Sequence, residues 1–406
     1  MTHLHSLYID PGTGSILFSV LVGIAASLYF LLRIFIQKIK FIILGGRVSE
    51  KNKNIYKYVI YCEGKQYYNV FAPILEQFEL NKTEVHYFTS SPNDPVLQSS
   101  YIYIKPKYIG EGNRAFAYLN FITAEVVLMT TPGLGVFQLK RAKTVRHYSH
   151  VLHSPSDATT YRLFGIDYFD SILLTGDYQA DDIRYLEKLR KLHEKKLTTV
   201  GCSYLDVYLQ KIQQIDSEME HQFTVLVSPS WGVSSLLSLY GESLLDPLKD
   251  SGWRIIIRPH PQSIISESSV LDYLHDRYAN CVNIMWDYAN DNVFSLKKAD
   301  VMISDFSGII FDYMFLFDRP VFYSNQDFDS RPYDFEDLNH ETWYNQTIRE
   351  TCIELRKEDF PNITELIKNA GNNESLVFAR RKARDTAWQY KGEAGKRIYN
   401  FMTEIV

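Results

Sequence analysis

Cysteine is scarce in this sequence and is never clustered. The four cysteines, Cys62, Cys202, Cys281 and Cys352, lie far apart in the 406 residues, with no CxxC spacing and no neighbouring group of histidines. This pattern argues against a disulfide framework and against a zinc site, and it fits reduced thiols in a cytosolic compartment.

A strong charge of either sign is also lacking. The formal net charge is −5, and the 43 Lys and Arg residues form no basic stripe, so no nucleic-acid partner is expected. No paired-carboxylate metal motif stands out, and neither an obligatory metal nor another obligatory cofactor is expected. The composition, 46% apolar and 22% charged, is that of a folded globular protein, and the length suits two domains.

One long apolar run is present. Ser15 to Ile36 holds a single charge, Arg33, and as a helix it would span about 33 Å, enough to cross the hydrocarbon core of a bilayer. No Lys or Arg precedes the run, whereas six follow it, at Lys38, Lys40, Arg47, Lys51, Lys53 and Lys57. The positive-inside rule then predicts a single-pass anchor in the cell membrane with the rest of the chain in the cytoplasm. The run is too long for a typical signal peptide, and an interfacial helix is the alternative that stays open.

From Lys57 onward, apolar strand candidates alternate with helical stretches. The expected strands of the first half are Tyr58–Tyr61, Glu84–Phe88, Tyr101–Ile104, Val126–Met129, Thr144–His153, Ser171–Leu174 and Leu197–Val200. Those of the second half are Phe223–Val227, Trp253–Ile257, Val282–Met285, Asp300–Ser304, Pro320–Tyr323 and Thr351–Leu355. Such alternation predicts two α/β domains, each with a largely parallel sheet that is covered on both faces.

The composition divides the chain into five parts. Residues 1–54 form the expected membrane anchor with its basic flank. The two α/β domains are expected at 55–205 and 223–373, and the polar, helix-favouring stretch 206–222 is the predicted hinge. The charged, helix-prone end, 374–406, is expected to pack back across both domains.

The turn Asp305–Gly308 joins a predicted strand to an apolar helix that is predicted at Ile309–Phe317. A helix that begins directly after a strand points unpaired N–H groups and the positive end of its dipole at the crevice above the sheet, where phosphates bind. Ser304, Ser307 and Gly308 suit a phosphate site because small residues allow close approach and hydroxyls donate hydrogen bonds. The alternative is that Asp305 and Ser307 only cap a buried helix.

The expected strand that ends at Ile257 is followed by the tetrapeptide RPHP, which contains Arg258 and His260. Two prolines end the strand and stiffen the turn at the carboxyl edge of the sheet, where α/β proteins bind ligands. Arg258 offers a fork of donors for phosphate oxygens, and His260 can donate to a phosphate or protonate a leaving group. The alternative is an ordinary surface turn.

Three histidines, His147, His150 and His153, lie in the segment RHYSHVLHSPSD. Their spacing does not place them on one face of a strand, which disfavours a metal cluster. His153 stands at a predicted strand end, and a neutral imidazole there is a candidate general base for a hydroxyl acceptor. His147 and His150 are expected to be core or surface residues.

Asp312 lies five residues after Ser307, which is about one and a half turns into the predicted helix. Its carboxylate can turn back toward the crevice and accept hydrogen bonds from ribose hydroxyls. The alternative is a solvent-facing charge on the helix.

Taken together, His153-Ser154, RPHP and the stretch SDFSGIIFDY with the following DRPVFY resemble the CDP-glycerol:poly(glycerophosphate) glycerophosphotransferase family of teichoic-acid and capsule polymerases and primases. The resemblance is clearest over about 145–340. It implies a GT-B architecture: two Rossmann-like domains face a cleft, an acceptor domain comes first, and the second domain holds the CDP-alcohol.

The resemblance also implies roles for individual residues. His153 corresponds to the essential histidine of the first domain, and Asp312 matches, in spacing, the ribose-binding acid of UDP-N-acetylglucosamine 2-epimerases. The donor pyrophosphate would be surrounded by Arg258, His260, Ser304, Asp305 and Ser307.

The expected function is transfer of a polyol phosphate, such as glycerol phosphate, from a CDP-alcohol to a hydroxyl of a lipid-linked cell-surface glycan, with release of CMP. The CDP-alcohol is a co-substrate, and the lipid-linked glycan and the membrane are the expected partners. Two alternatives stay open: a GT-B glycosyltransferase that uses a nucleotide sugar for surface polysaccharide synthesis, and a non-catalytic nucleotide-binding membrane scaffold.

Overall fold

The predicted membrane helix, Ser15 to Ile36, lies largely outside the residues that the structure describes. The computed structural model describes 27–29, 31–33, 35–36, 39, 55–215, 221–289, 291–325 and 330–406. Among these residues, no helix has both the length and the apolar character needed to cross a membrane. Residues 55–406 form one compact unit that holds both sheets.

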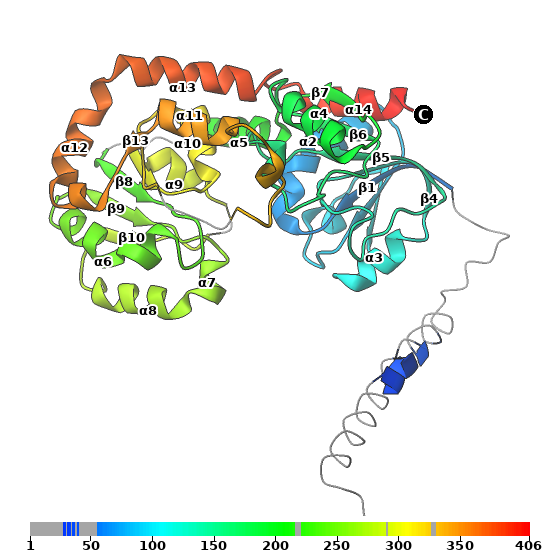
Figure 1. Cartoon of the computed structure of the whole chain (residues 1–406), viewed down its shortest axis with the longest axis horizontal. Helices are drawn as coiled ribbons and strands as arrows, with labels where there is room; N and C mark the ends of the chain where they lie inside the picture. The colour runs from blue at the N-terminus through cyan, green and yellow to red at the C-terminus, as the bar shows by residue number, and fades with distance from the viewer. Residues whose placement is uncertain are drawn as a thin grey trace, which may run out of the picture. The chain divides into compact units, whose positions relative to one another are not determined.

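The first sheet has seven parallel strands in the order β3-β2-β1-β4-β5-β6-β7. Figure 1 labels β1, β4, β5, β6 and β7 of this sheet. Its strands are β1 (Ile55–Cys62), β2 (Val85–Thr89), β3 (Ile104–Tyr108), β4 (Thr123–Met129), β5 (Val145–Val151), β6 (Ser171–Leu174) and β7 (Lys196–Thr199). The helices of this half are α2 (Tyr68–Leu80), α3 (Asn113–Leu119), α4 (Gln179–Arg190) and α5 (Ser203–Gln214). Apolar clusters cover both faces of the sheet, as the continuous apolar character of its central strands predicts. We call this half the first lobe.

The second sheet has six parallel strands in the order β10-β9-β8-β11-β12-β13. Its strands are β8 (Thr224–Val227), β9 (Arg254–Ile257), β10 (Ile284–Trp286), β11 (Val301–Ser304), β12 (Val321–Tyr323) and β13 (Ile353–Glu354). The helices are α6 (Leu236–Lys249), α7 (Ser263–Ser266), α8 (Ser268–Arg277), α9 (Val293–Lys298), α10 (Ile309–Phe317), α11 (Trp343–Thr351) and α12 (Ile363–Asn369). This sheet too is buried on both faces. We call this half the second lobe.

Two local predictions need correction. The strand expected at Tyr101–Ile104 is instead β3, Ile104–Tyr108, whose sequence IKPKY is largely exposed at the edge of the sheet. A proline and lysines suit an edge strand, because an edge needs fewer backbone donors and charge discourages further pairing. The helix-prone carboxyl end is divided into α13 (Glu374–Ala387) and α14 (Ala394–Glu404) by a loop in which Gly392 has a positive φ of 81°.

The two carboxyl-terminal helices lie on different lobes. α13 packs against α10 and α11 of the second lobe, and α14 packs against α2 and α5 of the first. Asp206 of α5 ties the loop between the two helices, because it accepts hydrogen bonds from Trp388 Nε1 at 2.9 Å and from the Gly392 amide at 2.8 Å.

The strand order defines where each sheet can bind a ligand. Chain order reverses between β1 and β4 in the first sheet and between β8 and β11 in the second. In open α/β sheets, ligands bind at the carboxyl ends of the strands on either side of such a reversal. The loops at these points are 63–67 and 130–135 in the first lobe, and 228–235 and 305–308 in the second.

The segment after β12 crosses to the first lobe and is held there by backbone contacts. Tyr333 forms an isolated antiparallel bridge with Arg162, and the Asp334 amide donates to the Tyr161 carbonyl at 2.9 Å. The Leu163 amide donates to the Pro332 carbonyl, also at 2.9 Å. This crossing segment, residues 332–337, therefore connects the loops of the two lobes.

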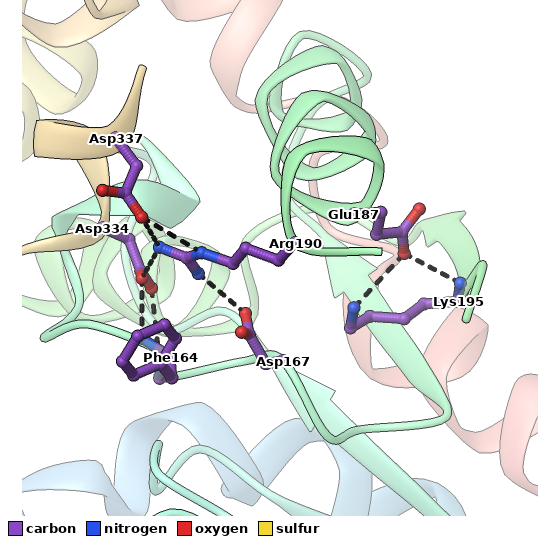
Figure 2. A network of polar contacts seen from close by, with 8 residues as sticks. Phe164, Asp167, Glu187, Arg190, Lys195, Asp334 and Asp337 are labelled. Atoms are coloured by element: carbon purple, nitrogen blue, oxygen red, sulfur yellow. Dashed lines mark hydrogen bonds and ion pairs between the residues drawn. The ribbon is translucent and has the colours of Figure 1, made fainter. Parts of the chain in front are cut away.

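An ion-pair network secures the same crossing segment (Figure 2). Arg190, at the end of α4, lies 2.9 Å from Asp167 of its own lobe and 2.7 Å from both Asp334 and Asp337 of the crossing segment. Asp334 also accepts hydrogen bonds from the amides of Phe164 and Gly165. Its side chain is fully buried, so its charge depends on these partners.

Candidate active site

A cavity of about 560 Å³ opens at the carboxyl edge of the first sheet. His153 lies in its wall, together with Tyr67 after β1 and Tyr161 after β5. Tyr333 of the crossing segment completes the wall, so both lobes contribute to the cavity. It lies where the strand order predicts a ligand site.

His153 is held by one of its two ring nitrogens. Nδ1 lies 3.0 Å from Thr130 Oγ1 and 3.0 Å from the Tyr161 hydroxyl. The edge of the Tyr67 ring packs against the imidazole, with ring centroids 5.2 Å apart. Because Nδ1 has these partners, Nε2 is the nitrogen left for the cavity. Burial lowers the pKa of His153 to about 4, so the imidazole is neutral at physiological pH.

The two histidines that were expected to be core or surface residues differ in their surroundings. His147 is half-buried, and its Nε2 lies 2.9 Å from Ser171 Oγ. His150 is fully buried in β5, but its Nε2 lies 3.0 Å from the Tyr161 hydroxyl that also contacts His153. His150 is thus a core residue that reaches the wall of the cavity through one tyrosine.

His260 is held in one orientation at the carboxyl end of β9. The Gln262 amide donates to its Nδ1 at 3.1 Å, so in the neutral ring Nε2 carries the hydrogen. The ring lies near Trp231, which belongs to the loop after β8. Burial lowers the pKa of His260. A neutral Nε2–H is a hydrogen-bond donor for an anion, whereas an imidazolium would place its Nδ1 hydrogen against the Gln262 amide.

Arg258, two residues earlier, already uses its guanidinium fork within the second lobe. Its terminal nitrogens donate to Asp287 and to the Ala289 carbonyl, both at 2.6 Å. The side chain is largely buried, and the bonds fix the loop after β10. The predicted contact between Arg258 and a phosphate stays a prediction, and it would add to this support of the loop.

Ser304 and Asp305 organise the loop after β8. Ser304 Oγ donates to the Ser228 carbonyl at 2.6 Å, and Asp305 accepts from the amides of Ser230 at 2.8 Å and Leu236 at 2.9 Å. Both side chains are buried, and burial raises the pKa of Asp305. They hold the two loops of the second strand-order reversal together, and their predicted contact with pyrophosphate stays a prediction.

Ser307 and Gly308 occupy the amino end of α10. Ser307 is half-buried and Gly308, the N-cap, is exposed. A Cβ atom placed on Gly308 would have no other atom within 4 Å, so open space lies directly beside the helix terminus. The predicted contact of an anion with this helix terminus stays a prediction.

Asp312 lies in the first turn of α10. Its side chain is half-buried near Cys202, at the start of α5, and burial raises the pKa of its carboxyl group well above the ordinary value. It lines neither the cavity at His153 nor the second cavity described below, so its predicted contact with ribose stays a prediction.

A second cavity, of about 290 Å³, lies beyond β11 and β12 of the second lobe. Asp305, Tyr323 and Tyr344 are among its lining residues. Of the described residues of the predicted site, His153 lines the first cavity and Asp305 lines the second, whereas His260 and Ser307 line neither.

The two cavities are linked by Asp157 and the start of α11. Asp157 lines the first cavity and accepts a hydrogen bond from the Tyr344 amide at 2.7 Å. The Tyr344 ring lines the second cavity and packs edge-on against Phe311 in the first turn of α10. The segment after His153 is thereby connected to the first turn of α10. Burial raises the pKa of Asp157 to about 7.

Sequence reasoning missed Thr130, Tyr161 and Tyr333. The break Thr130-Thr131-Pro132-Gly133 was visible as the end of a strand, and the strand-order rule could have placed it at a ligand site once β1 and β4 were known to be neighbours. Tyr161 and Tyr333 carry no local signal, because their positions depend on contacts between distant segments.

Within the part of the chain that the structure describes, no group of His, Cys, Asp and Glu has the arrangement of a metal site.

Solved structures with this architecture share the whole fold. The wall teichoic acid polymerase TagF aligns with a TM-score of 0.56 at 15% identity over 92% of this chain and 97% of that chain. The UDP-GlcNAc 2-epimerase from Neisseria meningitidis, bound to UDP-GlcNAc, aligns with a TM-score of 0.53 at 15% identity over 86% of this chain and 100% of that one. The epimerase from Methanocaldococcus jannaschii gives 0.53 at 14% identity, with 86% and 99% covered. The predicted α/β, GT-B-like fold is therefore confirmed.

The family follows from the sequence match. Residues 37–404 match the family described as CDP-Glycerol:Poly(glycerophosphate) glycerophosphotransferase. No curated protein sequence matches the chain. The chain belongs to this glycerophosphotransferase family, as its motifs predict, and it is a CDP-glycerol-dependent transferase.

Proposed function

We propose that this enzyme moves glycerol phosphate, or a similar polyol phosphate, from a CDP-alcohol to a hydroxyl of a lipid-linked cell-surface glycan and releases CMP. The observation that carries this proposal is the placement of His153. Its Nδ1 is held by Thr130 and Tyr161, and the ring lines a cavity to which both lobes contribute. This suits a base that receives the proton of an incoming hydroxyl.

The reaction would proceed as an in-line displacement at the β-phosphorus. The acceptor oxygen forms a bond to phosphorus while its proton passes to His153 Nε2. The bond between the β-phosphorus and the bridging oxygen breaks, and CMP leaves with the electron pair. His260, with a hydrogen on Nε2, and the amino end of α10 at Gly308 would stabilise the negative charge on the diphosphate.

The experiment that tests this function measures CMP. Purified full-length protein is incubated with a lipid-linked glycan acceptor and, in separate reactions, CDP-glycerol, CDP-ribitol or UDP-sugars. We expect acceptor-dependent CMP release from a CDP-alcohol. UDP release from a UDP-sugar, with CDP-alcohols inert, would establish the nucleotide-sugar alternative, and binding without any turnover would establish the scaffold.

The donor position can be tested at Gly308. Its backbone is helical and its Cβ position is open, so Gly308→Leu should fold normally while its side chain fills the space beside the helix terminus. We expect KM for CDP-glycerol to rise by about tenfold or more, because blocking a charge-assisted contact removes roughly 1.5–3 kcal/mol. Gly371→Leu is the matched control, since Gly371 is exposed and equally open. Equal KM values for the two variants would remove α10 from the donor site.

The proposal includes attachment to the cell membrane through Ser15–Ile36, with the transferase lobes in the cytoplasm. Its support is the apolar run and the Lys and Arg residues that follow it. Such an anchor would keep the enzyme close to a lipid-linked acceptor. Full-length protein should stay in the membrane fraction after an alkaline carbonate wash, and its recovery in the wash would show that the run does not span the bilayer.

A further inference from the structure

Three side chains of the first lobe form a hydrogen-bonded row that leads away from the cavity. His153 Nδ1 lies 3.0 Å from the Tyr161 hydroxyl, and the same hydroxyl lies 3.0 Å from Nε2 of His150. His150 is fully buried, with its ring edge-on to Tyr161. The row ends there, because within the described residues His150 Nδ1 has no hydrogen-bond partner.

Packing alone does not account for His150. A buried imidazole loses its contacts with water, and in the core an apolar side chain avoids that cost. Within the described part of the chain, the one hydrogen bond of the His150 side chain goes to the Tyr161 hydroxyl.

Protonation of His153 determines which atoms donate and which accept in this row of hydrogen bonds. An imidazolium carries a hydrogen on both nitrogens, so Nδ1 must then donate, and the Tyr161 oxygen and Thr130 Oγ1 are its two acceptors. If Tyr161 accepts, its own hydrogen points to His150 Nε2, which accepts as a neutral ring. The phenol keeps its proton, since burial raises the pKa of Tyr161.

We propose that Tyr161 and His150 are positioning residues that stabilise the protonated form of His153 and so strengthen it as a base. This inference rests on the proposed function, in which His153 receives the proton of the acceptor hydroxyl. No proton leaves Tyr161 or His150 during the reaction: the transferred proton stays on His153 Nε2 and later returns to solvent.

The surroundings of His153 make such support necessary. His153 is half-buried at the cavity wall, and within the described residues no carboxylate is hydrogen-bonded to its ring, so a positive charge there has little to stabilise it. The titratable and charged groups that face the ring or its cavity are Tyr67, Asp157, Tyr161, Arg162 and Tyr333, with His150 behind Tyr161.

The second lobe holds Tyr161 in place. The Asp334 amide of the crossing segment donates to the Tyr161 carbonyl at 2.9 Å, and the next residue, Arg162, forms the bridge with Tyr333. The support for His153 therefore depends on the contact between the lobes.

The test is Tyr161→Phe, which removes the hydroxyl and keeps the ring. We expect kcat to fall about tenfold or more and KM for CDP-glycerol to stay within about twofold. The hydrogen bond from the His153 imidazolium to Tyr161 forms as the proton is transferred, so its loss affects the chemical step and not the binding of CDP-glycerol. The acid limb of the pH profile should move to lower pH, since His153 becomes a weaker base. Tyr168→Phe is the matched control, because Tyr168 is an exposed tyrosine outside the cavity wall.

A second readout does not depend on turnover. In protein labelled with ¹⁵N-histidine, the titration of His153 should shift to lower pH in Tyr161→Phe and in His150→Leu, and stay near the wild-type position in His150→Gln, which keeps an acceptor for the hydroxyl. An unchanged His153 titration in both Tyr161→Phe and His150→Leu would overturn the inference, whatever the activity. If Tyr161→Phe does not fold, the two His150 variants decide. If the wild-type enzyme releases no CMP, the proposed function itself is refuted.

Discussion

Replacing His153 with alanine should lower kcat for CMP release by about 10²–10⁴-fold, the range that general-base catalysis supplies. The substitution removes the ring that lies between Thr130, Tyr161 and the cavity, and it leaves the hydroxyls of those two residues without the imidazole. The donor is expected in the second lobe, so KM for CDP-glycerol should change little. The measurement is steady-state CMP release by variant and wild type at saturating acceptor.

The matched control for this loss is His193→Ala. His193 is an exposed histidine just before β7 and lies outside both cavities, so its removal should leave kcat unchanged. Free imidazole offers a second check, because the space left by the side chain adds to a cavity of about 560 Å³ and can admit the small ring. Partial recovery of His153→Ala by imidazole is expected. Activity of His153→Ala within threefold of wild type would exclude His153 as the base.

The pH dependence follows from the same residue. Burial lowers the pKa of His153 to about 4, and a base must be unprotonated to act. The activity of the free enzyme should therefore be retained well below pH 6.5 and fall only as pH drops toward 4. An ordinary, solvated histidine would lose activity around pH 6.5.

The local elements around the donor end were predictable from sequence because neighbouring residues determine them. The apolar stretches of β11 and α10 and the small polar residues between them predict a strand, a turn and a helix, and α10 has the predicted bounds Ile309–Phe317. Likewise, β6 has its predicted bounds, Ser171–Leu174. Its short, mostly apolar sequence, SILL, marks a strand whose residues are all buried. Edge strand β3 was misplaced because its lysines and proline carry no apolar signal.

Side-chain direction within the turns could not be predicted. Ser304 and Asp305 have the residue types of a phosphate site, yet their polar atoms bond to backbone groups of residues 228–236, more than 60 positions earlier in the chain. The fork of Arg258 is likewise occupied by Asp287 and Ala289. The motif residues lie at the carboxyl edge of the sheet, and contacts between loops decide which of their groups remain for a ligand.

The crossing segment shows the same limit on a larger scale. Nothing in the sequence near Arg190 predicts that it pairs with residues about 145 positions later, and yet these pairs hold Tyr333 in the wall of the cavity. The wall of the candidate active site thus includes a contact that lies outside every recognisable motif.

Replacing Arg190 with alanine should destabilise the enzyme by about 3–5 kcal/mol, because removing one partner leaves the others as uncompensated buried charges. Arg190 is itself largely buried and contacts three carboxylates, of which Asp334 is fully buried and Asp167 nearly so (Figure 2). The free energy of unfolding can be measured from urea titrations followed by circular dichroism. Arg146→Ala is the matched control, since its pair with Glu125 is exposed and should contribute no more than about 1 kcal/mol.

The effect of Arg190→Ala should depend on pH in a defined direction. Burial raises the pKa of Asp334 to about 6, although the positive charge of Arg190 opposes the rise. A raised pKa means that the folded state binds the proton more tightly than the unfolded state, so this carboxyl group's contribution to stability falls as pH rises from about 4 through 6. Without Arg190 the pKa of Asp334 rises further, and the ionised form above pH 6 has lost its partner.

The destabilisation by Arg190→Ala should therefore be largest near pH 8 and smaller near pH 5, where Asp334 is protonated. A loss that is equal at both pH values would show that Arg190 acts through packing over Phe164, whose ring lies 4.8 Å from the guanidinium, and not through the carboxylates.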